Sequence, residues 1–161
     1  AQPINAETGG SFRVPATTTA RFNKDVTAYG YCQEGYGTKL KHFEDGDWYV
    51  IERCYTIKFF ADGAADPFTN YFYFVSDKED GRRIAFPTEV PAIVGKTFSA
   101  WDPATIAEQP EVDASYNAVY VPDDYTLTVN GGENAVITYS APAPYHYNDE
   151  VTVTAPSFVL P

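Results

Sequence analysis

Residues 48–60 have the sequence WYVIERCYTIKFF, a long run of aromatic and β-branched residues. Side chains alternate between the two faces of a β-strand, so this run divides into two sets. The first set is apolar except for Arg53 and consists of Tyr49, Ile51, Tyr55, Ile57 and Phe59. The second set mixes Trp48, Val50, Cys54 and Phe60 with Glu52, Thr56 and Lys58. We expect a long strand that buries the first face and presents a mixed surface on the second.

Shorter runs of the same kind fill the rest of the chain, separated by Gly, Pro, Asn and Asp. We predict strands near residues 12–22, 26–32, 38–43, 48–60, 70–76, 82–86, 96–100, 116–121, 126–130, 135–140, 150–154 and 157–160. One helix is predicted at residues 102–109, because Asp102 can cap it and Pro103 suits its first turn.

Three turn signals indicate tight connections between neighbouring strands: Asp45-Gly46, Asp80-Gly81 and Asn130-Gly131-Gly132. Tight connections join antiparallel strands. The sequence therefore predicts a single all-β domain over residues 1–161, an antiparallel β-sandwich of Ig-like or jelly-roll type with an extended N-terminal arm at residues 1–22. A closed β-barrel is the alternative fold.

Residues 69–76, TNYFYFVS, place four aromatic rings in a row. In a strand, Phe72 and Phe74 share one face and Tyr71 and Tyr73 share the other. Phenylalanine has no hydroxyl group that must be hydrogen-bonded, so its burial costs less. We expect the two phenylalanines inside and the two tyrosines on a face that is wet or covered by a partner.

The chain has 161 residues and a formal net charge of −11. This charge argues against binding to nucleic acid and to anionic membranes, both of which require a basic surface. No run of 18 apolar residues occurs, so no membrane span is expected. The first residues, AQPINAETGG, are typical of a mature N-terminus left by signal cleavage, so we expect a secreted or cell-surface protein.

Cys32 and Cys54 are the two cysteines, and both lie in predicted strands. For an exported protein we expect a disulfide between them. Two buried thiols are the alternative for a protein of a reducing compartment.

Catalytic and metal-binding signals are sparse. No nucleophile elbow, phosphate loop or dinucleotide fingerprint is present, so an enzyme is not expected. No cofactor is predicted, with calcium as a lesser candidate at the acidic turns of Asp45, Asp47, Asp123 and Asp124. His42 and His146 would form a zinc or copper site only if the fold brought them together.

Exposed aromatic rings suggest a second kind of function. Sugar rings stack on such side chains, which makes a carbohydrate-binding module one hypothesis. Its candidate residues are Trp48, Trp101, Tyr71, Tyr73, Tyr145 and Tyr147. A barrel that binds a small apolar ligand is a third hypothesis.

Assembly through strand edges is the hypothesis that we favour. Both ends of the chain have strand character, and Ser11–Phe22 or Val151–Leu160 would supply a strand to the open sheet edge of a neighbour. We therefore predict a noncatalytic, exported structural or adhesive subunit, such as a pilin-like or surface-filament subunit. Its partners would be further copies, other surface proteins or glycans.

Residues 145–158, YHYNDEVTVTAPSF, carry a resemblance that supports this hypothesis. A Tyr and an Asp precede an alternating Val/Thr run, which resembles the final strand of secreted fimbrial subunits of the chaperone–usher and spore-coat-U type. The resemblance covers about a dozen residues, together with an early disulfide that Cys32 and Cys54 would match. The family's usual glycine before the Tyr is missing, and Pro15 would interrupt an N-terminal donor strand.

Overall fold

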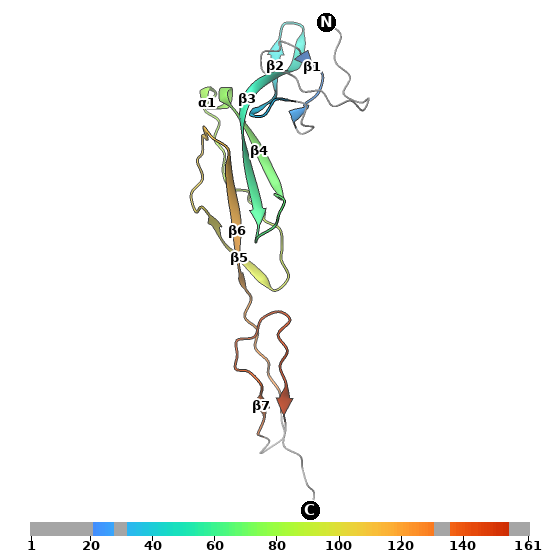
Figure 1. Cartoon of the computed structure of the whole chain (residues 1–161), viewed down its shortest axis with the longest axis vertical. Helices are drawn as coiled ribbons and strands as arrows, with labels where there is room; N and C mark the ends of the chain where they lie inside the picture. The colour runs from blue at the N-terminus through green and yellow to red at the C-terminus, as the bar shows by residue number, and fades with distance from the viewer. Residues whose placement is uncertain (1–20, 28–31, 131–135, 155–161) are drawn as a thin grey trace, which may run out of the picture.

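The computed structural model describes residues 21–27, 32–130 and 136–154. Its main sheet contains β1 (Arg21–Phe22), β2 (Tyr36–Phe43), β3 (Gly46–Ala61), β4 (Thr69–Phe74), β5 (Lys96–Asp102) and β6 (Ala114–Pro122). A short helix, α1 (Val75–Glu79), follows β4, and a separate two-stranded sheet contains β7 (Thr138–Tyr139) and β8 (Val153–Thr154). The molecule is elongated, with β1 and β2 near one end and β7 near the other (Figure 1).

The 16-residue strand β3 is the axis of the main sheet. Its first half pairs with both β1 and β2 at Tyr49 and Val50, so these two strands occupy opposite edges. Its second half pairs with both β4 and β6 at residues 57–59, again on opposite edges. The β3–β6 pairing is parallel, and the other pairings among the described strands are antiparallel.

One face of β3 carries the hydrophobic core, as its alternation predicts. Ile57 and Phe59 are fully buried in a cluster with Tyr73, Ile84 and Tyr116. Tyr49 and Ile51 pack instead against a second cluster, which is formed by Phe22, Val26 and Cys32. Arg53 lies between the two halves of this face, exposed to solvent and 5.5 Å from the centre of the Tyr55 ring.

Strand β6 alternates in the same way, with Tyr116, Ala118 and Tyr120 buried and the residues between them exposed. The covering of the main core comes from irregular segments, because Ile84 is buried in it while Phe86 and Ile106 pack against it. The Ile84 N–H donates to the Glu108 carbonyl at 2.8 Å, which joins two of these segments. The chain is mostly β, as predicted, but the main sheet is mixed and not purely antiparallel, because β3 and β6 are parallel. The described strands do not close into a barrel.

The row of aromatic rings differs from the prediction. Tyr73 is almost fully buried, with 1% of its surface exposed, while Phe72 is only half-buried. The Tyr73 hydroxyl donates to the Arg82 carbonyl at 2.8 Å, so its burial leaves no polar group unsatisfied. The prediction that both tyrosines face outward is therefore wrong: the chain supplies an internal acceptor for Tyr73, and Tyr71 packs against the same core.

The strand predicted at residues 70–76 ends at Phe74, where α1 begins. The buried Asp77 explains this change, because its carboxylate accepts a hydrogen bond from the Phe74 N–H at 2.8 Å. Lys39 of β2 donates to the same carboxylate at 2.9 Å, and Arg82 lies 3.3 Å from it. Burial raises the pKa of Asp77, but the hydrogen bonds from Lys39 and Phe74 and the charge of Arg82 outweigh this and lower the pKa below its ordinary value.

Two further local predictions are wrong. Asp80-Gly81 ends α1 and does not connect two strands of a hairpin, although Gly81 has the expected positive φ of 71°. The helix predicted at residues 102–109 is absent, because Asp102 is still paired with Asn117 at the end of β5. The Asp45-Gly46 turn, by contrast, joins β2 to β3 as predicted, and Gly46 has a φ of 124°.

The remaining predicted strands have mixed outcomes. Those at residues 38–43, 48–60, 96–100 and 116–121 are confirmed as parts of β2, β3, β5 and β6. Those at 135–140 and 150–154 shrink to β7 and β8, while 82–86 and 126–130 form no strand. Most residues of the strands predicted at 12–22, 26–32 and 157–160 lie outside the described residues. In the described ranges, no helix has the length and apolar character needed to cross a bilayer.

Candidate functional site

After β6 the chain leaves the main sheet and forms a narrow extension (Figure 1). We call this extension the arm and define it as residues 123–130 and 136–154; it is not the N-terminal arm expected at residues 1–22. Its two sides are joined by the β7–β8 pairing of Thr138 with Thr154 and Tyr139 with Val153. Nearer the main sheet, Tyr125 and Tyr145 exchange two backbone hydrogen bonds of 2.7 and 2.9 Å. The arm is therefore held together mostly by backbone pairing.

The arm buries very little apolar surface. Tyr145 is the one buried side chain among its described residues. The exposed large apolar side chains are Tyr125, Leu127, Val129, Val136, Tyr139, Tyr147 and Val153. A two-stranded sheet alone, such as β7–β8, is only marginally stable in water. A group of exposed apolar side chains indicates a surface that another molecule covers.

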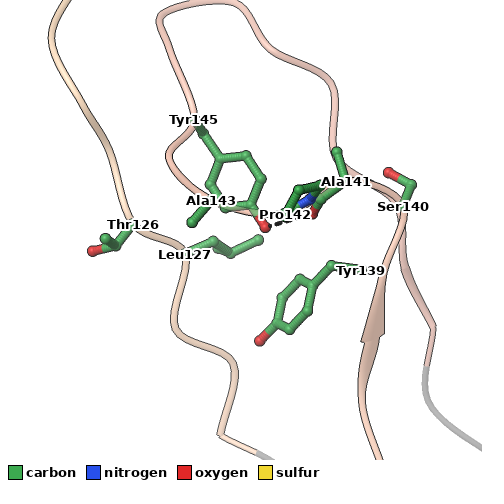
Figure 2. A pocket seen from close by; sticks show the side chains of 8 residues that line it. All are labelled: Thr126, Leu127, Tyr139, Ser140, Ala141, Pro142, Ala143 and Tyr145. Carbon is green, nitrogen blue, oxygen red and sulfur yellow. Dashed lines mark hydrogen bonds between the residues drawn. The ribbon is translucent and has the colours of Figure 1, made fainter.

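A groove of about 660 Å³ runs along the arm. It is lined by Thr126, Leu127, Tyr139, Ser140, Ala141, Pro142, Ala143 and Tyr145. Figure 2 shows the Leu127 side chain and the rings of Tyr139 and Tyr145 facing the same space. The Tyr145 hydroxyl donates to the Ala141 carbonyl at 3.0 Å, so the lining left for a partner is mainly apolar.

The arm is attached to the main sheet through Gly95, which precedes β5. The Asp123 N–H donates to the Gly95 carbonyl at 2.9 Å, and the Thr97 hydroxyl donates to the Asp123 carboxylate at 2.6 Å. Tyr147 packs directly against Gly95, where a Cβ atom would lie only 2.1 Å from the Tyr147 Cβ. The junction therefore depends on the absence of a side chain at Gly95.

Charge is distributed unevenly along the chain. All 11 Lys and Arg residues lie at or before Lys96, so residues 97–161 carry acidic side chains without Lys or Arg. Within the arm, His146 is the neighbour of the carboxylates: its Nε2 lies 3.3 Å from Asp124, and its backbone N–H donates to Asp149 at 2.7 Å. The arm is thus an acidic as well as an apolar surface.

The six candidate sugar-binding aromatics lie in different places. Trp101 stacks on Phe86 with ring centres 4.9 Å apart, and Tyr71 lies 5.1 Å from Phe59, so both belong to the periphery of the main core. Tyr73 is inside that core, and Trp48 is half-buried beside the β2–β3 turn. Tyr145 lines the groove of the arm, and Tyr147 packs at the junction. The structure does not gather the six rings into one platform.

The predicted disulfide is not formed, since Cys32 and Cys54 are both free and buried. The register explains the error, because the Cys54 N–H donates to the Gly35 carbonyl at 2.9 Å and Gly35, not Cys32, lies across from it. Both thiols line a cavity of about 250 Å³. Burial, followed by the nearby Cys32 and Asp113, raises the pKa of Cys54 to about 12, so this thiol stays protonated at neutral pH.

The acidic residues proposed for calcium are engaged with other side chains. Asp45 accepts two hydrogen bonds from Arg21, at 2.8 and 3.0 Å, and Asp47 lies 2.7 Å from His42. Asp123 and Asp124 contact Thr97 and His146, respectively. In the part of the chain that the structure describes, no three His, Cys, Asp or Glu residues are grouped as metal ligands. His42 and His146 therefore belong to no such group.

Sequence reasoning missed the residues that line the groove, above all Leu127, Tyr139 and Pro142. Tyr145 was among the candidate residues, but as an exposed ring for stacking on sugars, whereas the structure buries it beside the groove. The signal that would have drawn attention to this region is the absence of Lys and Arg after residue 96, combined with repeated Val, Tyr and Thr.

Comparisons of the chain with protein-family models, with curated protein sequences and with solved structures find no match.

Proposed function

We propose that this protein is a noncatalytic, exported structural subunit that associates with further copies through the strand edges of its arm. The observation that carries the proposal is the arm's exposure: among its described residues one side chain is buried, while seven large apolar side chains are exposed. An isolated surface of this kind is more stable when covered, because burial removes apolar area from water.

Backbone pairing supports the same function. β7 and β8 pair with each other, and neither has a second partner among the described strands. Each therefore offers an outer edge with unpaired N–H and C=O groups, to which an extended segment of another copy can add. The Leu127, Tyr139 and Tyr145 side chains beside these edges would then pack on the added strand.

The second face of the main sheet also supports association. On β6 this face exposes Val119 and Val121, at 40% and 46% of their surface. A neighbouring copy packed on this face would cover the two valines, as happens when two sheets pack face to face. Export to the cell surface belongs to the same proposal, although the two free, buried thiols are what a protein of a reducing compartment would have. The acidic composition limits nonspecific aggregation, because like charges repel.

Light scattering over a range of concentrations, with electron microscopy of the same samples, tests this function. Wild type should form large ordered assemblies. Leu127→Asp and Tyr139→Asp, which place a charge on the groove, should remain near the 17.8 kDa monomer mass. Val112→Asp is the matched control, because Val112 is 69% exposed on the main body, and it should assemble normally. Wild type that stays monomeric at every concentration contradicts the proposal.

A further inference from the structure

A second cavity, of about 280 Å³, lies beside the segment that follows α1. Its lining combines the aromatic rings of Tyr71 and Phe86 with Ile84 and Pro87, and it carries Arg82 and Arg83. Ile84 is buried, whereas the two arginine side chains are 59% and 68% exposed. We call this site the arginine pocket: an apolar surface with two cations beside it.

Both arginines keep donors for an incoming carboxylate. Among the residues that the structure describes, Arg82 contacts Asp77 through Nη1, at 3.3 and 3.4 Å, and Arg83 contacts Glu108 through Nη1. A guanidinium group has five N–H donors in a planar fork, so the other nitrogens of each side chain remain able to bind an anion. The pocket therefore suits an extended segment that carries both carboxylates and apolar side chains.

The end of the arm has this composition. Asp149 and Glu150 are exposed, and Val151 and Val153 follow them at alternate positions. Two arms would repel each other, because residues 97–161 include no Lys or Arg. The 11 basic residues all lie in the other part of the chain, so the arm's carboxylates can meet an opposite charge only there. Residues 1–122 also carry 17 Asp and Glu residues, so the complementarity is local to Arg82 and Arg83 and does not come from the main body as a whole.

We propose that residues 149–154 of one copy bind the arginine pocket of the next. This proposal rests on the self-association proposed above. The two carboxylates would pair with Arg82 and Arg83, and the valines would cover the aromatic rings. Such a contact joins two different surfaces and runs head to tail. Unless its rotation closes a ring, it produces an open filament.

A labelled peptide of residues 147–154, YNDEVTVT, tests the pocket directly by fluorescence polarisation with the full chain. Binding should weaken roughly tenfold in the Arg83→Gln variant and as salt is raised, since a charged contact is screened. Arg53→Gln is the matched control, because Arg53 is exposed elsewhere on the main sheet, and it should bind like wild type. Equal binding by the wild type and Arg83→Gln overturns the proposal.

Charge exchange in the full chain separates this inference from the proposed function. Arg83→Glu and Glu150→Arg should each reduce assembly in light scattering, and the double variant should restore it. If wild type assembles and both single variants assemble equally well, the pocket assignment is wrong while self-association stands. If wild type is monomeric, the contact between copies is wrong together with self-association, and peptide binding would then show only that the pocket accepts a segment of this composition.

Discussion

Gly95 and Tyr147 are packed so closely that a Cβ atom on Gly95 would lie 2.1 Å from the Cβ of Tyr147. Gly95 also has a φ of 74°, a conformation that residues with a side chain rarely adopt. The contact holds the arm against the start of β5, so this one glycine determines whether the arm can lie where the structure places it.

Gly95→Ala should therefore destabilise the protein more than an ordinary glycine substitution does. A positive φ alone costs alanine about 1–2 kcal/mol, and the overlap with Tyr147 adds about 1–3 kcal/mol. Gly63→Ala is the matched control, because Gly63 has a φ of 77° and no atom within 4 Å of the added Cβ. Urea unfolding of both variants measures the difference, and equal losses would mean that the Tyr147 contact does not resist the change.

Asp77→Asn should lower the free energy of unfolding by about 1.5–3 kcal/mol, because it removes the charge from buried hydrogen bonds with Lys39 and Phe74. Glu79→Gln, an exposed substitution on the same helix, should change it little. Chemical denaturation at pH 7 makes the comparison. A loss in Asp77→Asn no larger than that in Glu79→Gln would show that this carboxylate does not hold α1 to β2.

The same carboxylate predicts how stability depends on pH. Because its pKa is lowered in the folded protein, its contribution is fully present above its ordinary value of 3.8 and is lost as pH falls through the lowered value. Asp25 acts in the same direction. Burial raises its pKa, but hydrogen bonds from Thr27 and Thr38 outweigh this, so its pKa lies below the ordinary value. Unfolding free energies measured from pH 7 to pH 2 should fall below about pH 4. They should fall less steeply in Asp77→Asn.

The two thiols should be slow to react in the folded protein. Burial raises the pKa of both, that of Cys54 to about 12, and the thiolate is the reactive form. Iodoacetamide at pH 8 should leave the native protein unmodified and add two groups after unfolding, which mass spectrometry detects. Stability should decline as pH rises from 9 toward 12, because the unfolded state then releases a proton that the folded thiol retains. A mass difference of two hydrogens on reduction would contradict the free thiols.

Tyr73→Phe should cost about 0.5–1.5 kcal/mol, because it leaves the Arg82 carbonyl without the buried hydroxyl that donates to it. Tyr125→Phe is the control, since that ring is 45% exposed, and it should be close to neutral. Thermal or urea unfolding distinguishes them. A neutral Tyr73→Phe would mean that Gln109, whose Nε2 also donates to this carbonyl at 3.3 Å, satisfies it without the hydroxyl.

The strand class of the chain was predictable from local patterns. Residues 48–60 alternate so clearly that the buried face of β3 follows from the sequence, and Asp45-Gly46 marks its hairpin with β2. Val75–Glu79 was not predicted, because propensity favoured a strand there. In the structure the Asp77 carboxylate accepts from the Phe74 N–H and pairs with Lys39, 38 residues earlier, and the second of these contacts has no local signal.

The candidate site was harder to predict. In the sequence, Tyr73 and Tyr145 look no different from exposed tyrosines. In the structure each is buried, and each hydroxyl donates to a backbone carbonyl whose position depends on the fold. The sequence predicts a disulfide between Cys32 and Cys54, but the strand register places Gly35 across from Cys54 and both thiols are free. Register and pairing partners depend on contacts between distant segments, and no local pattern reports them.

The parallel pairing of β3 with β6 also determines the order in which this protein can fold during synthesis. Ile57 pairs with Ala114, so one edge of the second half of β3 stays open until residues 114–118 have left the ribosome. Pairings between distant segments form slowly, because the entropy cost of closing a long loop comes before the contacts that stabilise it. Throughout that interval the nascent chain presents one open edge of β3, so a chaperone that covers this edge should raise the yield of folded protein.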